Sequence, residues 1–152
     1  MTDISQLLVE ETDGACAYCG IKDYRVLTEH HIEQMEPKDQ SYDNRIILCH
    51  NCHHLYHQDK GPTLVELQEI KKRLICKILT QQGVNAIKES YRKGRVVASP
   101  YLVNHLIELG YMQQKEIHMT VGGVGDSGEI VGTAIYELTE PGKAFAHKWG
   151  LS

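Results

Sequence analysis

The segment from Cys16 to His57 concentrates side chains that bind metals. Its 42 residues hold two Cys-x-x-Cys pairs and six of the nine histidines of the chain. Four thiolates at this spacing are typical of a structural zinc site, which is closed tetrahedrally and leaves no coordination position open. The predicted zinc ligands are Cys16, Cys19, Cys49 and Cys52.

The histidines of this segment suit a second metal site, because the zinc already has four sulfur ligands. Neighbouring side chains on a strand point to opposite faces, so within the pair His30-His31 one ring can bind a metal while the other faces a water. His53 and His57 lie four residues apart and share one face of a helix. His54, three residues before His57, is an alternative to His53.

A hydrolytic site also needs a base near the water and a group that orients this base. The side-chain carbonyl of Asn44 is suited to fix the tautomer of such a base. Short elements must position these groups: residues 25–32 predict a strand, the polar residues 33–43 a loop, and 44–48 a second apolar segment. A helix is predicted from Cys52 until Gly61-Pro62 stops it.

The arrangement resembles the HNH endonucleases, the family with a ββα-metal finger. The similarity rests on HHI at 30–32, DNRIILC at 43–49 and CHNCHHLYH at 49–57, and it spans residues 14–60. It implies a zinc-stabilised ββα-metal nuclease module over residues 1–61. It also implies hydrolysis of DNA phosphodiester bonds, with 5′-phosphate and 3′-hydroxyl products.

Matching positions imply roles for single residues. His31 corresponds to the general base that activates water, and Asn44 to the residue that orients this base. His30, His53 and His57 correspond to the ligands of the catalytic divalent ion, for which Mg²⁺, Mn²⁺, Ni²⁺ or Zn²⁺ are the candidates. No small-molecule cofactor is expected.

Beyond residue 61 the pattern changes to helices followed by a hairpin. Thr63 and Glu66 have the spacing of a capping box, which opens a long connecting helix over 62–83 that ends at Gly83. The further elements expected are helices over 84–93 and 99–110, alternating segments around 115–121 and 129–136 joined by a glycine-rich turn, and a last helix from Thr139 to Lys148.

This succession resembles a winged-helix domain over residues 84–152. The resemblance rests on LIELGYM at 106–112 and YELTEPGKAF at 136–145. The fold class is therefore predicted to be α+β, with a small metal finger followed by a helical, winged-helix-like domain. Tyr136, Phe145 and Trp149 are expected to pack in the core or the hairpin. Because the wing has Asp126 and Glu129 and no cation near its tip, this domain suits either DNA or a protein partner.

The charge distribution points to DNA as the partner. The chain has a net charge of −4, but residues 61–100 hold eight Lys and Arg against three Asp and Glu. A basic segment suits the phosphate backbone, although a solvated helix face has the same composition. The candidate DNA contacts are Arg45, Lys71, Lys72, Arg73, Lys88 and Arg92.

Other expectations follow from composition. No apolar stretch approaches about 20 residues and no secretory signal opens the chain, so a cytoplasmic location without membrane contact is expected. The fifth cysteine, Cys76, is expected to be a buried small hydrophobe. The apolar stripe of the helix over 63–82 suits either a homodimer or packing within the chain. The alternative to an enzyme is a non-catalytic, zinc-containing DNA-binding or transcription-regulatory protein.

Overall fold

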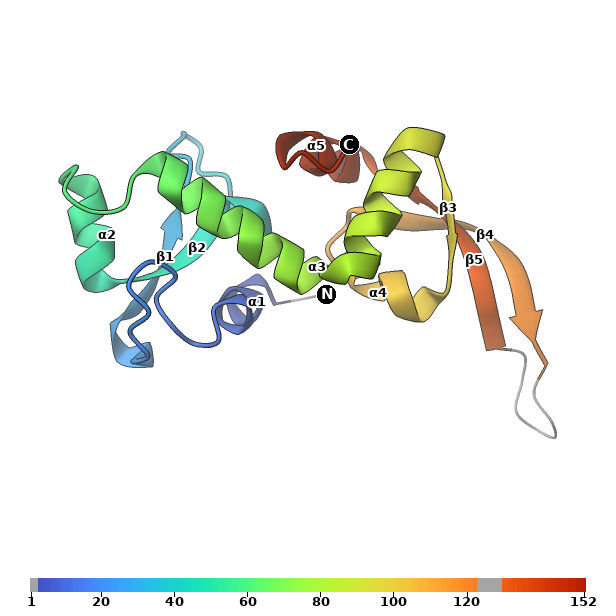
Figure 1. Cartoon of the computed structure of the whole chain (residues 1–152), viewed down its shortest axis with the longest axis horizontal. Helices are drawn as coiled ribbons and strands as arrows, with labels where there is room; N and C mark the ends of the chain where they lie inside the picture. Colours follow the sequence, from blue (N-terminus) through green and yellow to red (C-terminus); the bar gives the residue numbers. More distant parts are fainter. Residues whose placement is uncertain (1–2, 123–129) are drawn as a thin grey trace. The chain divides into compact units, whose positions relative to one another are not determined.

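The computed structural model describes residues 3–122 and 130–152, and its fold is α+β (Figure 1). The described residues form five helices and two small antiparallel sheets. The chain divides into two compact units, which we call the N-terminal unit, up to Ile78, and the C-terminal unit, from Leu79. Most of the glycine-rich turn predicted between the hairpin strands lies outside the described residues.

The N-terminal unit is built on a hairpin followed by a helix. Its elements are α1 (Ile4–Glu11), a 3-10 turn (Tyr24–Val26), β1 (Leu27–His31), a second 3-10 turn (Tyr42–Asn44), β2 (Arg45–Cys49), α2 (His50–His57) and the first part of α3. The strands pair antiparallel, with His30 opposite Ile46 and His31 opposite Arg45. The strand predicted within 25–32 is therefore confirmed, and the apolar segment predicted over 44–48 also forms a strand.

Several boundaries in this unit differ from the prediction, and helix α2 ends at His57, before the predicted stop at Gly61-Pro62. The first strand begins at Leu27 rather than at residue 25, because the side chain of Asp23 accepts the backbone N–H of Arg25 and starts a 3-10 turn. Helix α2 begins at His50 rather than at Cys52. The Sγ of Cys49 occupies the N-cap position and accepts the backbone N–H of Cys52, so a sulfur of the predicted zinc site starts the helix.

The core of the N-terminal unit surrounds the hairpin and the cysteines. One cluster of buried side chains there consists of Cys16, Ile32, Ile46, Leu48, Cys49, Cys52 and Leu67. Leu67 comes from α3, so the first part of this helix covers the hairpin core.

Helix α1 was not predicted from the sequence, and it places the buried carboxylate of Glu11 in this unit. Glu11 is fully buried, and its carboxylate accepts from Lys71 Nζ at 2.7 Å and from the hydroxyl of Tyr42 at 2.5 Å. Lys71 is also fully buried and lies over the Tyr42 ring. The prediction that Lys71 contacts DNA is therefore wrong: its ammonium links α3 to α1 inside the unit.

Helix α3 (Leu64–Lys93) opens with the predicted capping box. The Thr63 hydroxyl accepts from the Glu66 amide and the Glu66 carboxylate accepts from the Thr63 amide. The helix is interrupted at Thr80, with φ 64° and ψ 168°, rather than at Gly83. Thr80 Oγ1 accepts the backbone N–H of Gly83, as a cap for the second segment. Gly83 allows close packing instead of ending the helix, since a Cβ there would lie only 2.8 Å from Nε2 of His105.

The C-terminal unit places helices around a three-stranded sheet. Its elements are the second part of α3, β3 (Val96–Ala98), α4 (Pro100–Glu108), β4 (Met112–Val121), β5 (Ile130–Leu138) and α5 (Glu140–Lys148). The sheet order is β3-β5-β4, and all pairs are antiparallel. The predicted helix at Pro100, the hairpin strands and the helix after Thr139 are confirmed, whereas β3 was not predicted.

The core of this unit contains the three large aromatic side chains expected there. Tyr136, Phe145 and Trp149 are buried, and the ring of Phe145 stacks on Tyr111 with centroids 4.1 Å apart. In the part of the chain that the structure describes, no helix is both long and apolar enough to cross a bilayer.

Candidate metal centres

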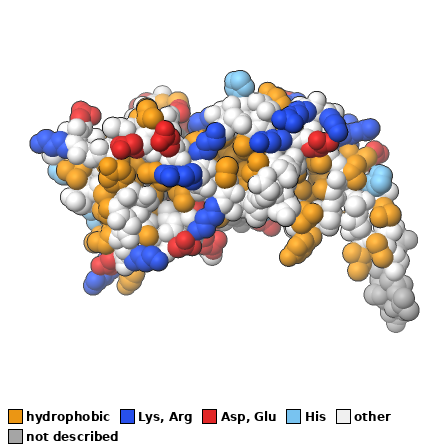
Figure 2. Space-filling view, in the orientation of Figure 1, with side chains coloured by type: hydrophobic (Ala, Val, Ile, Leu, Met, Phe, Trp, Pro, Cys, Tyr) orange, Lys and Arg blue, Asp and Glu red, His pale blue; other side chains and the backbone are white. Residues whose placement is uncertain are grey.

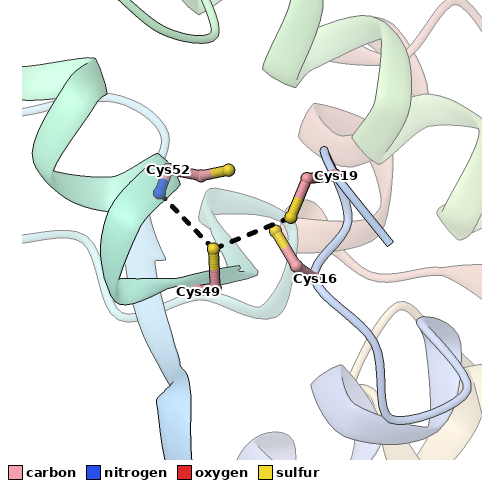
Figure 3. Close-up of side chains that lie close together, drawn as sticks. All are labelled: Cys16, Cys19, Cys49 and Cys52. Carbon is pink, nitrogen blue, oxygen red and sulfur yellow. Dashed lines mark hydrogen bonds between the residues drawn. The ribbon is translucent and has the colours of Figure 1, made fainter. Parts of the chain in front are cut away.

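The four predicted zinc ligands come together in the N-terminal unit. Their sulfur atoms all lie within 4.8 Å of one another, and those of Cys19 and Cys49 are 3.7 Å apart (Figure 3). Sulfurs about 2.3 Å from a tetrahedral zinc would be about 3.8 Å apart. The donor set and its spacing therefore fit zinc. Cys76 lies outside this group and is half-buried rather than buried.

The backbone around Cys16 favours the thiolate of this residue, which is the form that binds metal. The pKa of Cys19 and that of Cys52 are raised instead. Burial alone would raise the pKa of Cys16. Backbone N–H groups of Cys19, Cys49 and Tyr18 outweigh burial and lower this pKa to about 7. The turn from Cys16 to Gly20 provides part of this environment, since the Gly20 amide donates to the Cys16 carbonyl.

A second group consists of three histidines on two elements. The ring nitrogens of His30 on β1 and of His53 and His57 on α2 lie within 4.8 Å of one another. The ring centroid of His30 is 4.7 Å from that of His53 and 5.5 Å from that of His57. Within the described residues, these histidines and the four cysteines are the two groups able to hold a metal ion. Of the two alternatives on α2, the geometry brings in His53, while His54 is exposed.

His30 is the most unusual member of this group. It is 1% exposed, and neither of its ring nitrogens has a hydrogen-bond partner within residues 3–122 and 130–152. A buried polar group without a partner costs about 1–3 kcal/mol. Burial, followed by the charges of His53, His57 and His31, lowers the pKa of His30 to about 4. His30 is thus held as neutral imidazole, the form that coordinates metals.

His31 follows on the opposite face of β1. Its ring is half-buried, and Nε2 lies 3.1 Å from Oε1 of Gln40, a residue of the loop between β1 and β2. The charge of His31 is one of the causes that lower the pKa of both His30 and His53. The predicted base directly follows His30 on β1. Gln40 was missed because nothing distinguishes it in sequence from the other polar residues of its loop.

Asn44 is buried but does not contact His31 as expected. Its Oδ1 accepts from the backbone N–H of Glu33 at 2.9 Å. Its Nδ2 donates to the backbone carbonyls of Glu33 at 3.2 Å and Asp39 at 3.1 Å. The predicted direct hydrogen bond to the base is therefore wrong, because all these contacts of Asn44 are made with the backbone of the loop that follows β1.

The remaining candidate DNA contacts differ in accessibility. The side chain of Arg45 is 12% exposed and donates to Glu29 at 2.9 Å, so it is already paired. Lys72, Arg73 and Arg92 are exposed, and Lys88 is half-buried. Figure 2 shows lysine and arginine side chains on both units, interspersed with acidic ones. The described surface therefore offers scattered cations on α3.

Comparison with known proteins gives no further guidance. No family model matches the chain, and neither the curated proteins nor the solved structures contain a match.

Proposed function

We propose that this protein is a metal-dependent DNA endonuclease of the HNH type. The observation that carries the proposal is the group formed by His30, His53 and His57, in which a fully buried imidazole has no hydrogen-bond partner among the described residues. A divalent cation bound to these nitrogens would satisfy it. The group lies between a strand of a hairpin and the helix that follows, as in a ββα-metal finger.

The neighbouring side chains support hydrolysis rather than storage of a metal. A cation at the three imidazoles would polarise a phosphodiester and stabilise its transition state. His31 would take a proton from water, and the resulting hydroxide would attack phosphorus, leaving 5′-phosphate and 3′-hydroxyl ends. The four cysteines would hold a separate zinc that stabilises the N-terminal unit and leaves no position for substrate.

For the C-terminal unit we extend the proposal to a winged-helix-like domain. Two helices, an edge strand and a long hairpin in the order β3-β5-β4 support it. Helix α4 would be the recognition helix, and Tyr101 on it is 88% exposed. His105, another candidate for recognition on α4, is already bound to the carbonyl of Leu79 at 2.8 Å. DNA and a protein remain the two candidate partners of this unit.

Cleavage of supercoiled plasmid DNA tests the function. The zinc-loaded protein should nick or linearise the plasmid when Mg²⁺, Mn²⁺ or Ni²⁺ is added, and His31→Ala should lower the rate by roughly 10²–10⁴. His54→Ala, an exposed histidine on the same helix, is the matched control and should cleave normally. Undiminished cleavage by His31→Ala would remove the base assignment. Binding of DNA without cleavage in any of the three metals would instead favour a non-catalytic DNA-binding protein.

A further inference from the structure

The loop between β1 and β2 does more than connect two strands. It brings a side-chain amide to the ring of His31, with Gln40 Oε1 3.1 Å from His31 Nε2. An oxygen can only accept a hydrogen bond, so this contact requires the proton of the neutral imidazole to be on Nε2. The other nitrogen, Nδ1, is then unprotonated and free to act as a base.

Gln40 lies between points of the loop that are fixed to the rest of the unit. On one side of it, the carbonyl of Asp39 accepts from Nδ2 of the buried Asn44 at 3.1 Å. The carboxylate of Asp39 also accepts the backbone N–H of Ser41 at 2.9 Å, which closes a tight turn around Gln40. The loop is anchored at its start as well, where Asn44 contacts both backbone polar groups of Glu33.

These contacts form one continuous path. Asn44 fixes the backbone at Asp39, that backbone carries Gln40, and the side chain of Gln40 reaches the ring of His31. The path links the buried Asn44, which does not contact His31, to the ring of His31. A second glutamine of the same loop, Gln34, contacts His31 only through the backbone carbonyl and leaves the ring untouched.

We propose that Gln40 is a positioning residue for His31, and that its side-chain carbonyl holds the Nε2–H tautomer so that Nδ1 accepts the proton of the attacking water. This inference rests on the proposed nuclease function. In the step, an O–H bond of water breaks while an N–H bond forms at Nδ1. The hydroxide oxygen then bonds to phosphorus, the bond to the 3′ oxygen breaks, and this oxygen takes a proton from solvent.

Two near-isosteric substitutions separate the hydrogen bond from the volume of the side chain. Gln40→Glu keeps an oxygen acceptor, whereas Gln40→Met removes it. Because Gln40 is exposed, neither variant is expected to change the folding of the unit. Gln40→Met should lower kcat about tenfold with little change in KM, and Gln40→Glu should keep kcat within about twofold of the wild type.

The tautomer of His31 can be read without any cleavage. Ring ¹⁵N chemical shifts of the zinc-loaded protein at about pH 8, where an ordinary histidine is neutral, show which nitrogen carries the proton. We expect a single Nε2–H form in the wild type, in Gln40→Glu and in the control Gln34→Met. Gln40→Met should give a mixture of both tautomers.

The two readouts distinguish failure of this inference from failure of the proposed function. If the wild type does not cleave DNA, the nuclease proposal fails and the ¹⁵N shifts alone decide the pairing of Gln40. A proton on Nδ1 in the wild type would overturn the inference. It is also overturned if Gln40→Met keeps full kcat, or if Gln40→Glu loses as much kcat as Gln40→Met.

Discussion

Two adjacent histidines have different surroundings in this protein. His30 is buried beside the rings of Tyr56 and His53 and has no hydrogen-bond partner among the described residues, whereas His31 lies on the other face and contacts Gln40. The alternation of a strand produces this division. It puts the proposed metal ligand His30 and the proposed base His31 on opposite faces of β1.

The ligand assignment on α2 is tested by two single substitutions. His57→Ala removes a member of the three-histidine group and should weaken binding of Ni²⁺ or Zn²⁺ to the second site by a hundredfold or more, on the order seen when metal ligands and their supports are lost. His54→Ala, on the same helix but outside the group, should bind as the wild type does. Calorimetric titration of the zinc-loaded protein measures both, and equal effects of the two changes would contradict the assignment.

The burial of His30 predicts an unusual titration. Since its pKa is lowered to about 4, its ring should stay neutral as the pH falls from 7.5 to 5, whereas a free imidazole gains a proton near 6.5. Between these pKa values the unfolded chain binds more protons than the folded one, so His30 contributes stability that is lost as the pH falls from about 6.5 towards 4. Ring proton shifts measured across this range test it. A midpoint near 6.5 for His30 would show that the ring is solvated.

The residue types of the site could be predicted, but several contacts could not. Spacing alone paired Cys16 with Cys19, Cys49 with Cys52 and His53 with His57, because distances between residues three or four apart are set by the local backbone. The partner of Asn44 depends on the course of the polar loop over 33–43, for which the sequence carries no periodicity. The burial of Lys71 depends on Glu11, which is 60 residues away.

Among the elements, α1 shows how a short helix can depend on a buried ion pair. Glu11 at its last turn accepts from Lys71, and its backbone carbonyl also accepts from Lys77 Nζ at 3.2 Å. Burial raises the pKa of Glu11 and lowers that of Lys71, to about 8, so each charge depends on the other. Removing one partner leaves a buried charge unpaired, which is far more costly than removing both.

A double-mutant comparison tests the role of this pair. Lys71→Met should destabilise the N-terminal unit by about 3–5 kcal/mol, because the Glu11 carboxylate loses its cation. The double variant Glu11→Gln with Lys71→Met should recover most of that loss. Protection of the α1 amides from hydrogen exchange measures the local effect. A single variant as well protected as the wild type would contradict this account, as would a double variant less protected than the single one.

The elements that carry the four cysteines lead to a separate prediction. The turn after α1 and the start of α2 meet at the four sulfurs, so Cys49→Ser should lose the zinc and unfold the N-terminal unit, since a structural zinc contributes on the order of 10 kcal/mol. Cys76→Ser changes a half-buried cysteine outside the group and should retain the zinc. Zinc content and circular dichroism of the two variants test this, and retention of zinc by Cys49→Ser would contradict it.

The elements with strong local signals were predicted, and those without them were missed. Three local signals each predicted an element that the structure confirms. They are the capping box at Thr63, the proline at position 100 and the alternation of the hairpin strands. The break in α3 falls at Thr80 rather than at Gly83, because a threonine can cap a helix and a glycine can serve close packing instead. Strand β3 is only three residues long, too short for a periodicity.

For the whole molecule, the sequence indicated a division into a metal-rich part and a helical part. The structure places the division between Ile78 and Leu79, next to the break in α3. The sequence had instead predicted a separate connecting helix over 62–83 between the two parts. Each unit has its own buried core. The proposed chemistry needs only the N-terminal unit, which contains both candidate metal groups and His31.

The measurement that bears most directly on this account is the location of the bound ions. Crystals of the zinc-loaded protein grown with Ni²⁺ should show zinc anomalous scattering at the four cysteine sulfurs. They should also show nickel scattering at a second site whose ligands are His30, His53 and His57, beside His31. A map without nickel at these three histidines, or with nickel bound elsewhere and His30 still unpaired, would contradict the central claim.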